Sequence, residues 1–89
     1  MVQQRDDTDA ETRALQVLAW ALGDDNRRDR LLAMTGMTPD DLRARAGSRE
    51  VLGAVMGWLA NHEPDLLAAS EDLQIRPEQL AATYQELSR

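Results

Sequence analysis

Hydrophobic residues recur along the chain at the spacing of helix faces, and Gly, Pro and short polar stretches interrupt this pattern at short intervals. The predicted helices span residues 9–22, 26–35, 39–46, 49–61, 64–72 and 77–88. No stretch alternates apolar and polar residues as a half-buried strand does. The sequence therefore predicts an all-α fold of five to six short helices. Because short linkers favour steep crossings, we expect an irregular orthogonal bundle around the central helix at about 49–61.

Both ends of the first helix carry recognisable signals. Thr8 and Glu11 have the spacing of a capping box, in which each side chain satisfies the backbone N–H of the other residue. Gly23 suits the position that follows a helix. Residues 1–7 are polar and lack periodicity, so we expect a disordered tail there. Residues 8–89 are then expected to form a single helical domain, since a chain of 89 residues is too short for more than one compact domain.

The apolar residues predict which side of each helix is buried. The helix at 49–61 has one wide apolar arc, formed by Val51, Leu52, Val55, Met56, Trp58 and Leu59. The apolar side of the first helix carries Leu15, Leu18 and Leu22, flanked by Ala14, Ala19 and Ala21. The corresponding residues are Leu31, Leu32 and Met34 in the second helix, Leu66, Leu67 and Leu73 in the fifth, and Leu80, Tyr84 and Leu87 in the sixth. We expect these sides to pack around the helix at 49–61.

Several segments follow one another in an order that is similar to a known protein family. These segments are Ala14–Trp20, Leu31–Arg43, Val51–Leu59 and Leu66–Ala69. Together they resemble a small family of bacterial proteins, found mainly in alphaproteobacteria, that is classed as a domain of unknown function. The resemblance covers about residues 10–85 and implies an all-helical single domain. It implies no particular activity, cofactor or catalytic residue.

The composition excludes several kinds of site. The chain has 16 acidic residues against 10 arginines, a net charge of −6, one His and no Cys. Without Cys there is no disulfide or thiolate zinc site, and a single His cannot form a two-histidine metal site. The acidic balance disfavours general binding to nucleic acid or to anionic membranes. Because no apolar segment is long enough for a signal peptide or a membrane span, we expect a cytoplasmic protein.

The polar residues that suggest catalysis all have simpler interpretations. Ser48 directly precedes a predicted helix and is expected to be its N-cap. His62 follows a helix, where we expect it to be solvated, although Glu63 or Asp65 is close enough in sequence to pair with it. Most paired acidic residues stand at helix starts or in loops, where the helix dipole favours them. We therefore expect no enzyme, with no catalytic residue, no cofactor and no metal.

The basic residues are concentrated in residues 27–49, where six arginines and three aspartates give a net charge of +3. The arginines are Arg27, Arg28, Arg30, Arg43, Arg45 and Arg49. With Gly36 at a turn between two predicted helices, they suggest a helix-turn-helix that contacts nucleic acid. Asp40 and Asp41 at the start of its second helix oppose this hypothesis, because their carboxylates would repel phosphates. The alternative is an arginine face paired with nearby acids.

Three further residues are candidates for an interaction surface. Gly53 and Gly57 lie about one turn apart in the most apolar helix, where each Gly costs about 1 kcal/mol relative to Ala. Close approach of another helix would offset this cost, and that helix belongs either to the same domain or to a partner, including a second copy of the chain. Trp20 points about 140° away from Leu15 around its helix. It is therefore either enclosed, most simply by the helix at 77–88, or exposed as a binding anchor.

These features predict a non-catalytic protein–protein interaction module of a bacterial cytoplasm. Its expected partner is an unidentified protein or a second copy of the chain, and a membrane is not expected. The alternative is a helix-turn-helix-like nucleic-acid-binding domain that uses the arginines of residues 27–49. The predicted interaction surface consists of Trp20, these six arginines, Gly53 and Gly57.

Overall fold

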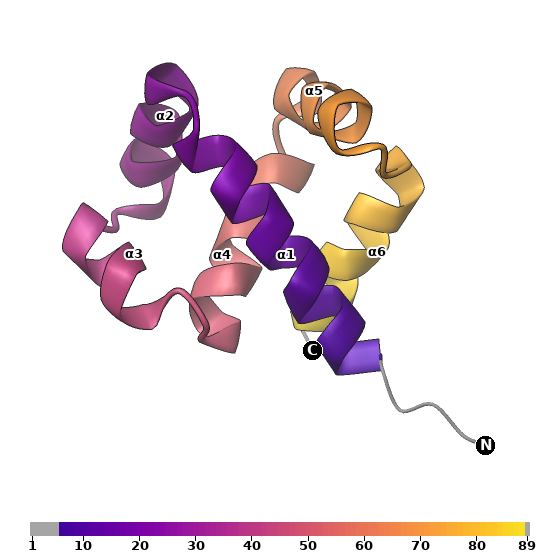
Figure 1. Ribbon diagram of the computed structural model, residues 1–89, viewed down its shortest axis with the longest axis horizontal. Helices are drawn as coiled ribbons and strands as arrows, with labels where there is room; N and C mark the ends of the chain where they lie inside the picture. The colour runs from indigo at the N-terminus through magenta and orange to yellow at the C-terminus, as the bar shows by residue number, and fades with distance from the viewer. Residues whose placement is uncertain (1–5, 89) are drawn as a thin grey trace.

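Helices account for almost all of the structure, a computed structural model that describes residues 6–88. The six helices in this range are α1 (Asp6–Leu22), α2 (Asp25–Thr35), α3 (Pro39–Arg45), α4 (Arg49–Ala60), α5 (Glu63–Leu73) and α6 (Pro77–Leu87). Figure 1 shows α1 crossing the middle of the molecule, with α2 and α3 on one side and α5 and α6 on the other. No strand forms within residues 6–88, so the prediction of an all-α fold is confirmed.

Side-chain caps mark the starts of α2, α3 and α4, and a proline in the first turn marks the starts of α5 and α6. The Ser48 hydroxyl accepts a hydrogen bond from the backbone N–H of Val51 at 3.1 Å, which confirms Ser48 as the N-cap of α4. Thr38 and Asp41 form a capping box at the start of α3. Gly36, with a φ of 74°, ends α2 in the left-handed conformation that glycine adopts without strain. Helices α2 to α6 therefore begin and end within one residue of their predicted positions.

The start of α1 differs from the prediction. The helix begins at Asp6, so Thr8 lies inside it and is not the N-cap. Acidic residue types such as Asp6 and Asp7 are favoured in a first helical turn, because the helix dipole is positive there. They extend the helix into the segment that was predicted to be a disordered tail. The rest of that segment, residues 1–5, lies outside the described range.

The core lies where α1, α4 and α6 pack against one another. All six large apolar residues predicted for α4 are buried, so its central place is confirmed. From α6, Leu80 and Leu87 are buried as predicted, and Tyr84 is half-buried against the core. Thr83 of α6 is also buried; its hydroxyl donates to the Gln79 carbonyl at 2.8 Å, so the burial leaves no unpaired donor.

Helix α1 turns its alanines to the core and leaves two of its leucines exposed. Its fully buried side chains are Ala10, Ala14, Val17 and Ala21. Leu18 is also buried, but Leu15 and Leu22 remain 42% and 40% exposed, so the prediction that they face the core is wrong. Short side chains let α1 approach both α4 and α6 closely, which a row of leucines would prevent.

Helices α2 and α5 each contact the core through a narrow face. Leu31 of α2 is buried as predicted, whereas Met34 is 76% exposed. In α5 the predicted Leu67 is 51% exposed, and the buried residues are Asp65 and Ala69. The predictions for Met34 and Leu67 are wrong because both helices lie at the edge of the molecule, where only one side meets other helices.

The glycines of α4 lie beneath α6 of the same chain. A Cβ atom at position 53 would lie 3.5 Å from the Leu87 carbonyl oxygen, which is ordinary van der Waals distance. A Cβ atom at position 57 would lie 3.2 Å from Cε1 of Tyr84, which is tight enough to require movement of the ring. The helix that packs against these glycines is therefore one from the same domain, which was one of the two alternatives predicted from the sequence. A role of these glycines in association stays a prediction.

We expect Leu59→Ala to lower the free energy of unfolding by about 2–5 kcal/mol, because it leaves a cavity at a fully buried position of the central helix. Chemical denaturation followed by circular dichroism measures the change. Leu67→Ala is the matched control, since Leu67 is 51% exposed and its truncation should cost far less. Equal losses in the two variants would contradict the central place of α4.

The two glycines are expected to respond differently to alanine. Gly53→Ala should stabilise the protein by about 0.5–1 kcal/mol, because it gains helix propensity without a clash. Gly57→Ala should gain less or lose stability, because the Tyr84 ring must shift. In a Tyr84→Ala background the effect of Gly57→Ala should become more favourable. Thermal melts of the double-mutant cycle test this coupling, and equal effects in both backgrounds would refute it.

Candidate functional site

The exposed leucines of α1 border a groove between α1, α2 and α3. Leu18 and Leu22 line it from α1, and the facing apolar residues are Leu32, Pro39, Leu42 and Ala46. The groove encloses about 590 Å³. Leu15 lies two turns before Leu22 on the same side of α1, so it extends the apolar surface along the helix. We call this surface, made of Leu15 and the apolar residues lining the groove, the leucine groove.

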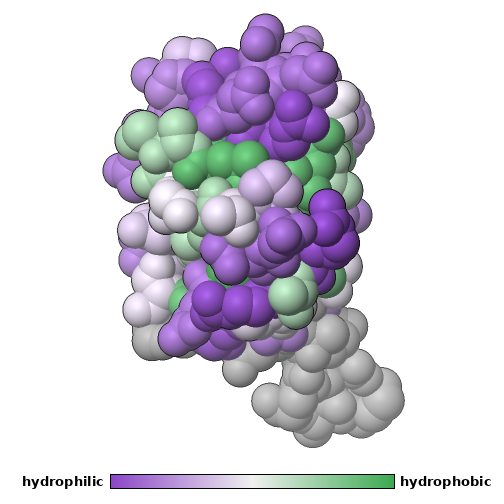
Figure 2. Space-filling view, turned by 90° about the vertical axis from the view of Figure 1, so that its left-hand side faces the viewer, coloured by the Kyte–Doolittle hydropathy of each residue, from purple (hydrophilic) through white to green (hydrophobic). Residues whose placement is uncertain are grey.

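Figure 2 shows this side of the molecule, with a hydrophobic band between the hydrophilic surface of α2 at the top and the mainly hydrophilic surface below it. Three charged residues, Arg28, Asp29 and Arg43, also line the groove. A contiguous apolar surface with a polar rim is typical of places where another molecule binds. Sequence reasoning missed the groove because it assigned these leucines of α1 to the core.

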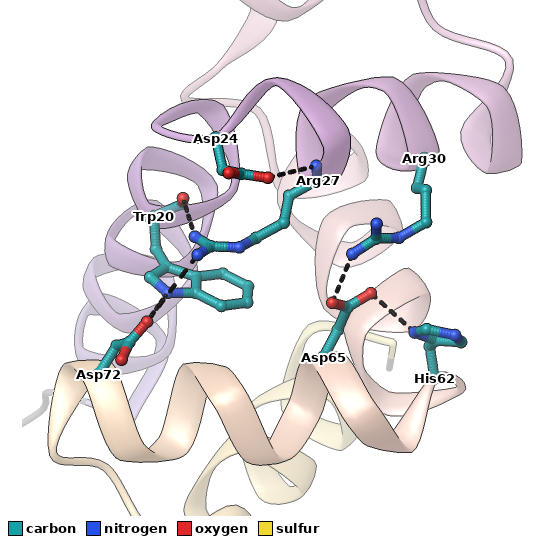
Figure 3. Close-up of polar contacts among 7 residues, drawn as sticks. All are labelled: Trp20, Asp24, Arg27, Arg30, His62, Asp65 and Asp72. Carbon is teal, nitrogen blue, oxygen red and sulfur yellow. Dashed lines mark hydrogen bonds and ion pairs between the residues drawn. The ribbon is translucent and has the colours of Figure 1, made fainter.

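Trp20 connects α1 to α2 and α5 through the contacts drawn in Figure 3. Its indole N–H donates to Oδ2 of Asp72 at 2.8 Å. The Arg27 guanidinium lies 4.0 Å from the centre of the indole ring and donates to the Trp20 carbonyl at 3.0 Å. Trp20 is thus half-buried, but its neighbours belong to α2 and α5. The helix at 77–88, which was expected to enclose Trp20, supplies none of these hydrogen-bond and ring partners.

Asp65 joins α2 to the start of α5. Its side chain is 8% exposed, and both of its oxygens are engaged (Figure 3). Oδ1 accepts from Nη2 of Arg30 at 2.6 Å, and Oδ2 lies 2.7 Å from Nδ1 of His62. The expectation that His62 is merely solvated is therefore wrong: it pairs with Asp65, one of the two partners considered from the sequence. The buried Asp65 carboxylate therefore links α2 to the start of α5 through its two partners.

The six arginines of residues 27–49 have partners on several helices. Arg28 pairs with Asp25 and Asp29, Arg43 with Asp40, and Arg45 with Glu50, at distances of 2.7–3.5 Å. Arg49 donates to the Glu86 carbonyl at 2.6 Å. Arg27 and Arg30 meet the carboxylates of Asp72 and Asp65 on α5. The arrangement matches the alternative in which the arginines pair with nearby acids.

Within residues 6–88, no group of three or more His, Asp or Glu side chains is placed to hold a metal ion. None of the helices in this range combines the length and the apolar character that crossing a membrane demands.

Comparison with known proteins identifies one family. A family model described as "Protein of unknown function (DUF3572)" matches residues 7–89. No curated protein and no solved structure matches the chain.

We expect Asp65→Ala to lower the free energy of unfolding by about 1–2 kcal/mol, because it removes charged hydrogen bonds from Arg30 and His62. The loss is limited because both of those side chains reach water. Asp29→Ala is the control: Asp29 is 70% exposed and lies 3.5 Å from Arg28, so its removal should change stability by less than about 0.5 kcal/mol. Urea denaturation measures both changes in the free energy of unfolding. Equal changes in the two variants would show that the contacts of Asp65 between α2 and α5 do not stabilise the fold.

Proposed function

We propose that this protein, which belongs to the DUF3572 family of proteins of unknown function, is a non-catalytic protein–protein interaction module. The observation that carries this proposal is the leucine groove. Leu15 and Leu22 are 42% and 40% exposed, whereas the residues of α1 that face the core are buried. When a partner covers exposed leucines beside an apolar groove, their removal from water makes the free energy of binding more favourable.

The shape of the groove favours a helical partner. Its walls are helices, and its apolar residues form a strip that continues along α1 through Leu15. An amphipathic helix binds such a groove by inserting apolar side chains at helical spacing. Arg28, Asp29 and Arg43 at the rim offer both signs of charge to the polar side of that helix. The apolar contacts would supply most of the affinity and the rim would set the orientation.

The non-catalytic part of the proposal rests on how the acidic residues are used. Asp41 accepts from the Thr38 backbone N–H at 3.2 Å, and Asp40 pairs with Arg43 at 2.9 Å. Asp65 already has both oxygens engaged. General acid–base chemistry needs a carboxyl group that is free to exchange a proton with a substrate. These carboxylates stabilise helices and helix contacts instead.

A helix-turn-helix-like nucleic-acid-binding domain remains the alternative proposal. The order α2, turn at Gly36, α3 has the right form for it. Two observations weigh against it. The first turn of α3, which would approach the bases, carries Asp40 and Asp41. The arginines that would contact phosphates are paired with carboxylates, and the chain has a net charge of −6.

A photo-crosslinking amino acid placed at position 22 tests the proposal in the cells that make the protein. We expect a crosslink to a discrete protein that survives nuclease treatment, because the groove would bring the partner into contact with this side chain. The same amino acid at position 67 is the control, since Leu67 is exposed but lies on α5, outside the groove. Leu22→Glu, added in trans, should fail to compete for the partner.

Three outcomes would contradict the proposal. Crosslinks of equal strength at positions 22 and 67 would show that the leucine groove is not the interface. The absence of any crosslink at position 22 would show the same. Loss of the crosslinks after nuclease treatment would favour the nucleic-acid alternative. A crosslink between two copies of the chain, checked by light scattering, would identify the partner as a second copy.

A further inference from the structure

A second hollow lies between α2 and α4. It encloses about 510 Å³ and shares no lining residue with the leucine groove. Its apolar wall is formed by Ala33, Met34, Ala54, Gly57 and Trp58. Its polar residues are Arg30, Thr35, Asn61 and His62. We call this space the α2–α4 hollow; its volume falls within the range of about 300–1,000 Å³ that is common for small-molecule sites.

Among the polar residues of the α2–α4 hollow, Arg30 carries the positive charge, and no carboxylate lines the hollow. The Thr35 hydroxyl and the Asn61 amide already donate to the backbone carbonyls of Leu31 and Gly57. Asp65 lies behind Arg30 and His62 and is occupied by both, at 2.6 and 2.7 Å. A guanidinium carries five N–H donors, so Arg30 keeps donors beyond its contact with Asp65. The Arg30 side chain is 44% exposed, which leaves these donors within reach of a bound molecule. A group that accepts hydrogen bonds is therefore favoured at this end.

Trp58 adds a donor in the apolar wall. Its side chain is almost fully buried at 7% exposure, and its indole N–H has no acceptor among the hydrogen bonds of residues 6–88. Every polar side-chain atom that is completely buried in this range has a partner, so this N–H must reach solvent. Trp58 is one of the residues that line the α2–α4 hollow. A nearly buried indole N–H usually finds an acceptor, and a ligand would supply one here.

From these observations we propose that the α2–α4 hollow binds a small amphipathic molecule with an apolar chain and a carboxylate head. The chain packs against Ala33, Ala54 and the Trp58 ring. The carboxylate accepts hydrogen bonds from Arg30 and from the Trp58 N–H, because charged acceptors form the stronger hydrogen bonds. Met34, 76% exposed at the edge of the hollow, has a flexible side chain that can close over the chain of the ligand.

Isothermal titration calorimetry of the full chain with decanoate, below its micelle concentration, tests this proposal. We expect one saturable site. Decylamine and decanol have the same chain with a different head, so they separate recognition of the carboxylate from general apolar adsorption. Decanoate should bind at least about tenfold more tightly than decylamine, since the hollow presents donors and a guanidinium to the head group.

Two variants locate the site. Ala54→Leu fills the hollow from an exposed position of α4 and should abolish binding of decanoate. Ala81→Leu makes the same change at an exposed position of α6 outside the hollow and should leave binding unchanged. Trp58→Phe keeps a ring but removes the N–H, and should weaken binding about three- to tenfold. Circular dichroism confirms that each variant is folded before it is titrated.

Each contrary result would overturn the proposal. No saturable heat with decanoate would refute the site, and equal affinities for decanoate and decylamine would refute recognition of the carboxylate. Unchanged binding by Ala54→Leu would place the ligand elsewhere. Unchanged binding by folded Trp58→Phe would remove the indole N–H from the site. None of these results bears on the leucine groove, because the two surfaces share no lining residue.

Discussion

The close packing of α1 against α4 and α6 is the constraint on which the other features depend. α1 meets these helices with its alanine face, and α4 places Gly53 and Gly57 beneath α6. Small side chains allow helix axes to approach until backbone and side-chain atoms are in contact. When an amphipathic helix turns its small residues inward, its large apolar residues must lie elsewhere. Leu15 and Leu22 are displaced to the surface in this way, so the leucine groove follows from how the core is packed.

The position of α2 depends on a second, polar set of contacts. Arg27 and Arg30, one turn apart on α2, meet Asp72 and Asp65, which are two turns apart on α5. Surface ion pairs of this kind contribute little individually, but the burial of Asp65 and the indole contact of Arg27 give these pairs a fixed geometry. Because α2 forms a wall of both the leucine groove and the α2–α4 hollow, its ion pairs with α5 help to hold one wall of each.

Most local interactions could be predicted from the sequence, with the capping box at Thr8 as the exception, and contacts between distant residues could not. Ser48 and Thr38 mark helix starts because their hydroxyls accept hydrogen bonds from the backbone N–H groups three residues later. The apolar arc of α4 is wide enough to show which side of the helix faces the core. The side of α1 that faces the core was predicted wrongly. Hydrophobicity alone favours burial of Leu15, whereas the narrow space between the helices favours burial of the smaller Ala14. Arg30 reaches Asp65 across 35 residues of sequence, a contact that neither spacing nor composition indicates.

The neighbouring places of α1 and α6 have a consequence for biosynthesis. Arg13 of α1 donates to the Thr83 hydroxyl at 2.8 Å, across 70 residues of sequence. The core is therefore complete only after residues 77–87 have left the ribosome, and until then the side of α4 that faces α6 is exposed to solvent. The nascent chain is open to aggregation, or to chaperones that hold apolar segments, until α6 emerges.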